Sequence, residues 1–262
     1  MLMLRFRLRT GKIAFESVGI NEATVFTGLC AKHDAELFKL IDTEPDLRNS
    51  REWLFLHAYR AVIRETHASI EAGVKVQLTY QKKCELGMLN RDIPTREGML
   101  AVERLALAYE THEYKELWDT AFLQQNFLGV RHDVLDLGWT GPCIAVSSLF
   151  SLDEIVLRSG TPRVALNILP LPDGHSLAIF SYTRPETEAA RSFLGPILNG
   201  NSSQQRYLLS RLVLERSDNI AFNPLLLEKL GTERQEAIRA FEEATVLQNQ
   251  PDWDDERLNL FP

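Results

Sequence analysis

The chain has 262 residues, and its 29 basic and 36 acidic side chains give a formal net charge of −7. Hydrophobic residues make up 45% and charged residues 25%, which is close to an average globular protein and excludes a collagen-like chain or a disordered tail. No run of about 18 apolar residues predicts a membrane span. The acidic balance argues against a general nucleic-acid coat protein, whose affinity depends on Lys and Arg.

Three cysteines, Cys30, Cys84 and Cys143, are spaced far apart in the sequence. An odd number of distant cysteines is typical of free thiols in a reducing compartment. We therefore expect a cytoplasmic protein whose fold does not depend on disulfides.

The first residues predict a β-hairpin. Apolar residues and arginines alternate from Leu4 to Arg9, which is the period-2 pattern of a half-buried strand. Thr10-Gly11 is expected to form a two-residue turn, so that Phe6 would face Phe15 across the hairpin. The arginines would then form a stripe on the outer face, either holding phosphate or protecting an edge strand by charge.

Helical patterns follow. One helix is expected from Ala31 to Ile41. Ser50 is a suitable N-cap for a long helix beginning at Arg51. A second long helix is expected from Thr95 towards Gln125. Helical spacing predicts the residues that face the core. In the first long helix these are Leu56, Tyr59, Ile63 and Ile70. In the second they are Val102, Leu105, Tyr109 and Leu117.

The second half begins with strands and ends with helices. Residues 143–150, 163–169 and 176–182 read as strands, the last two joined by the turn Pro172-Asp173-Gly174. Ser202 or Ser203 would cap a helix running through Leu214, and Thr232 with Gln235 would form a capping box. The last twelve residues are expected to be a loosely held tail. The order predicts an α+β fold, with regions 1–130 and 131–262 as two domains or one continuous domain.

The compact chemical motif is Cys30-Ala-Lys-His33-Asp34. A Cys-x2-His pair can supply two ligands of a tetrahedral zinc, and Asp34 could orient the imidazole from the second shell. Two further ligands would have to come from elsewhere in the fold. The alternative is a helix start with a buried thiol and a partly exposed histidine. Phosphate-loop, dinucleotide, HExxH, serine-hydrolase and kinase motifs do not occur.

The first long helix offers a second candidate site. His57, Arg60, Arg64 and His67 recur at spacings of three and four, so they would share one helix face. Two arginines and two imidazoles could bind a phosphate or a carboxylate. A solvated helix face has the same pattern.

Residues 18–38 resemble a group of uncharacterised bacterial proteins. Their shared stretch has the form A-T-x-F-x-G-F-C-x-x-H-D-x-x-L-F, matched here by Ala23-Thr24-Val25-Phe26 through Leu37-Phe38. In fuller members an earlier Cys-x2-Cys completes what looks like the treble-clef zinc site of HNH-type nucleases. By position, Cys30 and His33 match the second knuckle, and the first is missing from this sequence. The resemblance therefore implies a degenerate or truncated treble clef.

Two functional hypotheses follow. The first is a non-catalytic interaction or regulatory protein whose partner is another protein, or a second copy joined through the N-terminal edge strand. The second is a metal-dependent, HNH-like nuclease or nucleic-acid-binding protein with an incomplete zinc site. We favour the first, and we expect no association with a membrane.

Overall fold

The computed structural model describes residues 1–7, 10–19, 28–153, 155, 157, 160–246 and 255–261. Its centre is a seven-stranded antiparallel sheet in the order β2-β1-β7-β4-β5-β6-β3. The strands are β1 (Leu2–Arg7), β2 (Lys12–Ser17), β3 (Val130–Asp136), β4 (Ile144–Ser151), β5 (Arg163–Pro170), β6 (Ser176–Thr183) and β7 (Ile220–Phe222).

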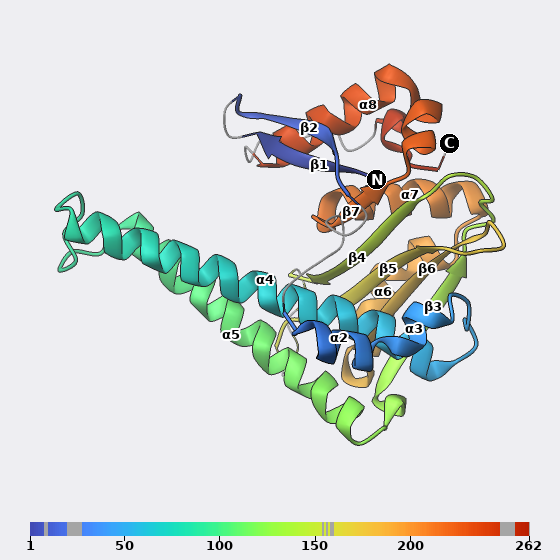
Figure 1. The fold of residues 1–262 in the computed structure, drawn as a ribbon, viewed down its shortest axis with the longest axis horizontal. Helices are drawn as coiled ribbons and strands as arrows, with labels where there is room; N and C mark the ends of the chain where they lie inside the picture. The colour runs from blue at the N-terminus through green and yellow to red at the C-terminus, as the bar shows by residue number, and fades with distance from the viewer. Residues whose placement is uncertain are drawn as a thin grey trace.

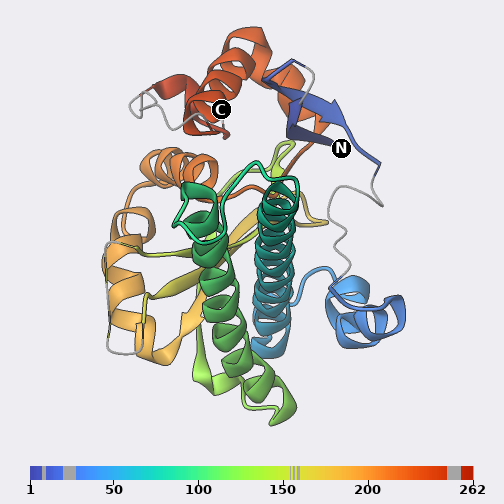
Figure 2. The ribbon, with the colours of Figure 1, turned by 90° about the vertical axis from the view of Figure 1, so that its left-hand side faces the viewer.

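Helices cover both faces of this sheet. The long helix α4 packs across β4 and β5, and α6 and α7 pack on the opposite face (Figures 1 and 2). The helices are α2 (Ala31–Leu37), α3 (Lys39–Thr43), α4 (Arg51–Glu85), α5 (Arg96–Leu123), α6 (Thr187–Leu198), α7 (Ser202–Arg216) and α8 (Pro224–Val246). This arrangement confirms the predicted α+β class, with its N-terminal hairpin, long helices, central antiparallel strands and C-terminal helices.

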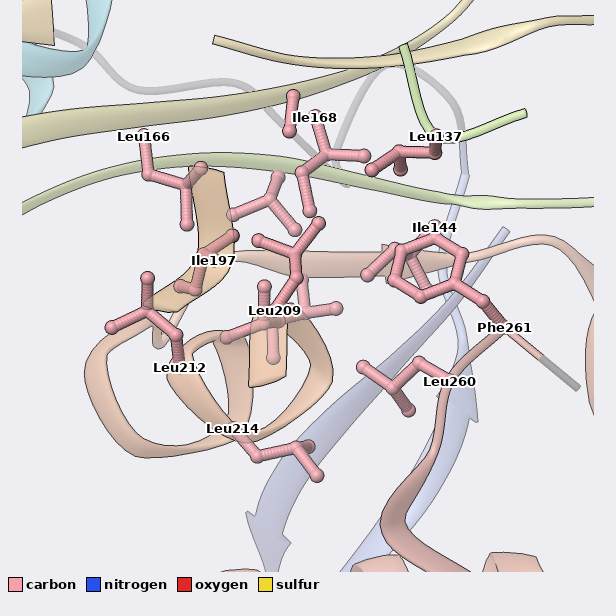
Figure 3. Packing of buried hydrophobic residues seen from close by; sticks show 14 of the residues in the cluster. Leu137, Ile144, Leu166, Ile168, Ile197, Leu209, Leu212, Leu214, Leu260 and Phe261 are labelled. Carbon is pink, nitrogen blue, oxygen red and sulfur yellow. The ribbon is translucent and has the colours of Figure 1, made fainter. Parts of the chain in front are cut away.

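Two hydrophobic clusters follow from the alternation of side chains along the strands. Figure 3 shows the larger cluster, in which sheet residues such as Ile144 and Leu166 meet Leu209 and Leu212 of α7. The smaller cluster joins the other face to α4 through Trp53, Phe55 and neighbouring aromatic rings. Central strands buried on both faces explain the near-continuous apolar runs of β5 and β6.

The N-terminal hairpin forms, but with a different register from the one expected. Phe6 faces Ile13 and Arg7 faces Lys12, whereas the expected two-residue turn would have paired Phe6 with Phe15. Phe6 is exposed. Arg7 donates to Glu16 at 2.8 Å, which neutralises part of the predicted arginine stripe. Arg9 lies outside the described residues.

Both long helices begin where the sequence predicts. The Ser50 hydroxyl accepts from the Trp53 amide at 3.3 Å, and the Thr95 hydroxyl accepts from Gly98 at 3.1 Å. The core-facing residues Leu56, Tyr59 and Ile63 are buried as predicted.

Three expectations for the helices were wrong. The helix expected from Ala31 to Ile41 breaks at Phe38. Ile70 is exposed, and so are the α5 residues expected inward: Val102, Leu105, Tyr109 and Leu117.

In the second half, Gly174 adopts φ 86° in the predicted turn, and its amide donates to Leu171. The cap of α7 is Asn201, one residue before the two serines expected, because its side chain reaches the Ser203 and Gln204 amides.

The expectation of a loosely held C-terminal tail is wrong for residues 255–261. Leu258, Leu260 and Phe261 are buried in the larger cluster.

None of the helices that the structure describes is both long enough and apolar enough to cross a membrane.

Candidate functional site

The Cys-x2-His motif lies at the start of α2. Cys30 precedes the helix, and its Sγ lies 3.3 Å from Nδ1 of His33, one turn later. Two ligands of one tetrahedral zinc would be about 3.6 Å apart, so this spacing suits half of a zinc site. Across the described residues, however, no group of three or more His, Cys, Asp or Glu side chains is arranged to hold a metal. Asp34 instead lies 3.6 Å from Arg60.

A cleft of about 320 Å³ lies between α4 and the sheet. Three of the four residues predicted to share a helix face, His57, Arg60 and Arg64, line it together with Asp34. His67, further along α4, does not belong to its lining. Sequence reasoning missed the opposite wall, which only folding brings to the helix: Ala145, Val146, Ser147, Ile168, Leu169 and Asn219.

Carboxylates already engage Arg60. Its two terminal nitrogens donate to both oxygens of Asp42 at 2.9 and 3.1 Å, a bidentate geometry that fixes the guanidinium plane. The guanidinium carbon also lies 4.2 Å from the ring centroid of Phe38. Arg60 therefore ties α3 to α4.

Arg64, one turn further along α4, is held in a similar way. Both terminal nitrogens donate to one oxygen of Asp218 at 3.2 Å, and Glu65 lies 3.8 Å away. Together the two arginines face four carboxylates within 4 Å, so the surplus charge at the cleft is negative. A phosphate would have to displace these partners before binding both arginines.

His57 supplies the least satisfied polar group of the cleft. Its Nε2 is shielded from solvent and has no hydrogen-bond partner within the described part of the chain. Burial, and next the charge of Arg60, lower the pKa of His57 to about 3. The ring packs edge-on against Trp53, with centroids 4.2 Å apart. His57 is therefore neutral near pH 7, and its buried Nε2 makes no hydrogen bond with the described residues.

A second candidate site is the hairpin of α4 and α5, which projects far from the sheet (Figure 1). We define the arm as residues 67–110, all of which the structure describes. Large apolar side chains cover its outside; for example, Val102 is 68% exposed and Tyr109 is 62% exposed. The exposed apolar residues of the arm are Ile70, Val74, Leu78, Leu86, Met88, Ile93, Met99, Leu100, Val102, Leu105, Leu107 and Tyr109.

Small residues fill the seam between the two helices of the arm. Within residues 67–110 the buried positions are Gly73, Ala101 and Ala108. A Cβ at Gly73 would lie 3.2 Å from Leu105 Cδ2 and 3.3 Å from the Arg104 carbonyl oxygen, so the helices are in close contact there. The fully buried positions of the arm are thus small, and most of its large apolar side chains are exposed, although Leu105 and Tyr80 also reach the seam. Soluble helices normally have the opposite distribution.

A buried polar network attaches the root of the arm to the sheet. The Glu186 carboxylate accepts from the amides of Arg163 and Thr183, each at 2.9 Å, and from Tyr114 Oη of α5 at 3.1 Å. Arg163 donates to the carbonyl of Glu110 at 2.9 Å. These contacts fix the direction in which the arm leaves the body.

Comparison of the chain with protein-family models, with curated proteins and with solved structures gave no match in any of the three. The site must therefore be interpreted from its own geometry.

Proposed function

We propose that the protein is a non-catalytic interaction protein that binds another protein chain with the arm. The observation that carries this proposal is the exposure of the arm's large apolar residues around a seam of Gly73, Ala101 and Ala108. Monomeric soluble proteins rarely expose contiguous apolar patches larger than a few hundred Å², and larger patches mark interaction surfaces. An arm held clear of the body is also accessible to a partner along its length (Figure 1).

Site-specific photo-crosslinking in cells that express the protein tests this role. A photoreactive phenylalanine analogue replaces Val102, whose side chain is exposed on the arm. The matched control places the same analogue at Glu188, which is exposed on α6. We expect a covalent protein adduct at position 102 and none at position 188. The absence of an adduct at position 102, with the protein folded and abundant, would refute the interaction role.

The second candidate function is a metal-dependent, HNH-like nuclease or a nucleic-acid-binding protein. The convergence of His57, Arg60 and Arg64 on one cleft favours it. The carboxylates that engage both arginines disfavour it, because phosphate binding needs uncompensated positive charge. Titration of the protein with inorganic phosphate and with a short DNA duplex separates the two functions. Saturable binding lost in Arg60→Ala and Arg64→Ala would favour the nucleic-acid role.

Zinc belongs to the same candidate function. If Cys30 and His33 contribute to a metal site, purified protein will contain one zinc per chain, lost in both Cys30→Ala and His33→Ala. Elemental analysis makes this comparison directly. A bound zinc would supply a Lewis acid or a structural crosslink beside Asp34.

A further inference from the structure

We infer that the partner of the arm is the arm of a second copy of this chain, and that the two arms pack antiparallel as a four-helix bundle. The inference rests on the proposed interaction role and names its partner. Three features of the arm support it: a continuous apolar face, a charge gradient along its length, and an area sufficient for a stable dimer.

The apolar face contains one row of side chains from each helix. Ile70, Val74 and Leu78 recur every four residues and share one side of α4. Val102, Leu105 and Tyr109 fall within an arc of about 60° on α5 at 100° per residue. Leu105 packs against Gly73, which lies on the seam side of α4, about 60° around the helix from Ile70. The two rows therefore adjoin on one side of the hairpin.

The charge of the arm changes sign along its length. The tip, residues 82–96, holds four basic and two acidic residues, a net charge of +2. The shaft, residues 67–81 and 97–110, holds two basic and four acidic residues, a net charge of −2. The arm as a whole is neutral, so the chain's net charge of −7 lies outside it. Antiparallel packing places each positive tip against the other negative shaft, whereas parallel packing would bring like charges together.

The size of the face suits a dimer. From residue 67 to residue 85 the arm is about 28 Å long, and two adjacent helices are roughly 20 Å wide. One face therefore covers roughly 560 Å², and two faces together roughly 1,100 Å². A specific interface needs about 1,000 Å² in total. Because the same face serves both copies, the pair closes with two-fold symmetry and does not grow into a filament.

The alternative self-association surface is the edge strand β2, which the sequence suggested. Its Ile13 amide donates to the Glu243 carboxylate of α8 at 2.9 Å. A second β-strand would have to displace that contact and α8, which packs on β2. The arm needs no such rearrangement, because its apolar rows are already exposed.

Sedimentation equilibrium of the full chain tests the inference. We expect the wild type to have twice the mass of one chain at micromolar concentration. In the double variant Val74→Glu/Val102→Glu, we expect the dimer dissociation constant to rise at least 100-fold. Each substitution acts twice in a symmetric pair, and glutamate is a good helix former, so the fold is retained. The control is the double variant Leu123→Glu/Leu225→Glu, which introduces the same two charges at exposed positions outside the arm.

A wild type that remains monomeric at 100 μM (about the highest concentration of the experiment) overturns the inference. A dimer that withstands the double variant also overturns it, because another surface then holds the copies together. Circular dichroism of each variant verifies that helix content is unchanged.

Charge reversal tests the antiparallel orientation. Reversing the tip with Arg91→Glu/Arg96→Glu should weaken the dimer about tenfold, since both tip and shaft become negative. Adding Glu71→Lys/Glu103→Lys to the same chain should restore affinity. Tighter binding after tip reversal alone would overturn the antiparallel arrangement.

The crosslinking experiment separates this inference from the proposed function on which it rests. An adduct at position 102 with twice the mass of the chain supports both. An adduct of another mass, with a monomeric purified protein, retains the interaction role and overturns self-pairing. The absence of an adduct overturns both.

Discussion

Replacing Glu186 with glutamine should loosen the attachment of the arm to the body. Glu186 is 5% exposed, and its carboxylate accepts from the Arg163 amide on one oxygen. The other oxygen accepts from the Thr183 amide, the Thr183 hydroxyl and Tyr114 Oη, at 2.9, 2.6 and 3.1 Å. All the groups that face this side chain in these contacts are donors. An amide at this position therefore introduces a donor where an acceptor is required.

The magnitude follows from counting these bonds. In its better orientation, glutamine keeps the three bonds on the Thr183 side, and its NH2 group then faces the Arg163 amide. Leaving a buried donor unpaired costs about 1–3 kcal/mol, and bonds to a neutral acceptor are weaker than bonds to a charged one. We expect a loss of about 2–4 kcal/mol in the free energy of unfolding. For a chain of this size that corresponds to a Tm lower by roughly 4–7 °C.

Thermal melts followed by circular dichroism measure this change, and Glu188→Gln on the exposed side of α6 is the matched control. Hydrogen exchange adds a local measurement, because residues 111–118 at the root of α5 should exchange faster in Glu186→Gln. A variant that melts within about 1 °C of the wild type would show that the network does not hold the root. Our account of how the arm is oriented would then fail.

Three further predictions concern burial and pH. Leu56→Asp should unfold the protein or lower its free energy of unfolding by several kcal/mol. Ile70→Asp, on the same helix but 43% exposed, should leave the monomer's Tm within a few degrees of the wild type. Equal effects of the two substitutions would contradict the helix register. Burial, and next Asp218, raise the pKa of Glu242 to about 7, so the folded state keeps a proton that the unfolded chain loses, and stability falls as pH rises from 4.5 to 7. Glu242→Gln should remove this fall and add up to about 3 kcal/mol to the free energy of unfolding at pH 8. The control Glu228→Gln, on the exposed side of α8, should leave the pH dependence unchanged. The pKa of His57 is lowered, so stability is lost as pH falls from 6.5 towards 3, and His57→Gln should flatten that loss in urea titrations.

The starts of the two long helices and the turn at Gly174 were predictable because their signals are local. Ser50 and Thr95 carry the side-chain oxygen that a helix start requires, and Gly174 adopts the positive φ of its turn. The first hairpin was predictable as a hairpin but not in register, because the length of its connection decides which residues face each other. Nothing local to Arg7 or Lys12 indicates that they are partners.

The inward face of α5 could not be predicted from the sequence, because a helical row of large apolar side chains is ordinarily expected to face a core. That assumption holds for α4 where it crosses the sheet, as Leu56 and Ile63 show. It fails where the helix extends past the sheet, and sequence periodicity contains no signal for that point. Only one wall of the cleft could be predicted from the sequence. His57, Arg60 and Arg64 share a helix face, whereas the strands of the opposite wall come from residues far away in the chain.

The small residues of the seam explain how a thin arm can serve as a binding surface. A hairpin whose helices touched through large side chains would consume its own apolar surface in holding itself together. With Gly73, Ala101 and Ala108 at the contact, the backbones approach closely, and most of the large apolar side chains remain exposed. The network around Glu186 fixes the root, so the arm is ordered before a partner arrives. Ordering a binding surface in advance lowers the entropy lost on association. Burying the exposed apolar rows can therefore add more to the affinity than burying a flexible segment of the same composition would.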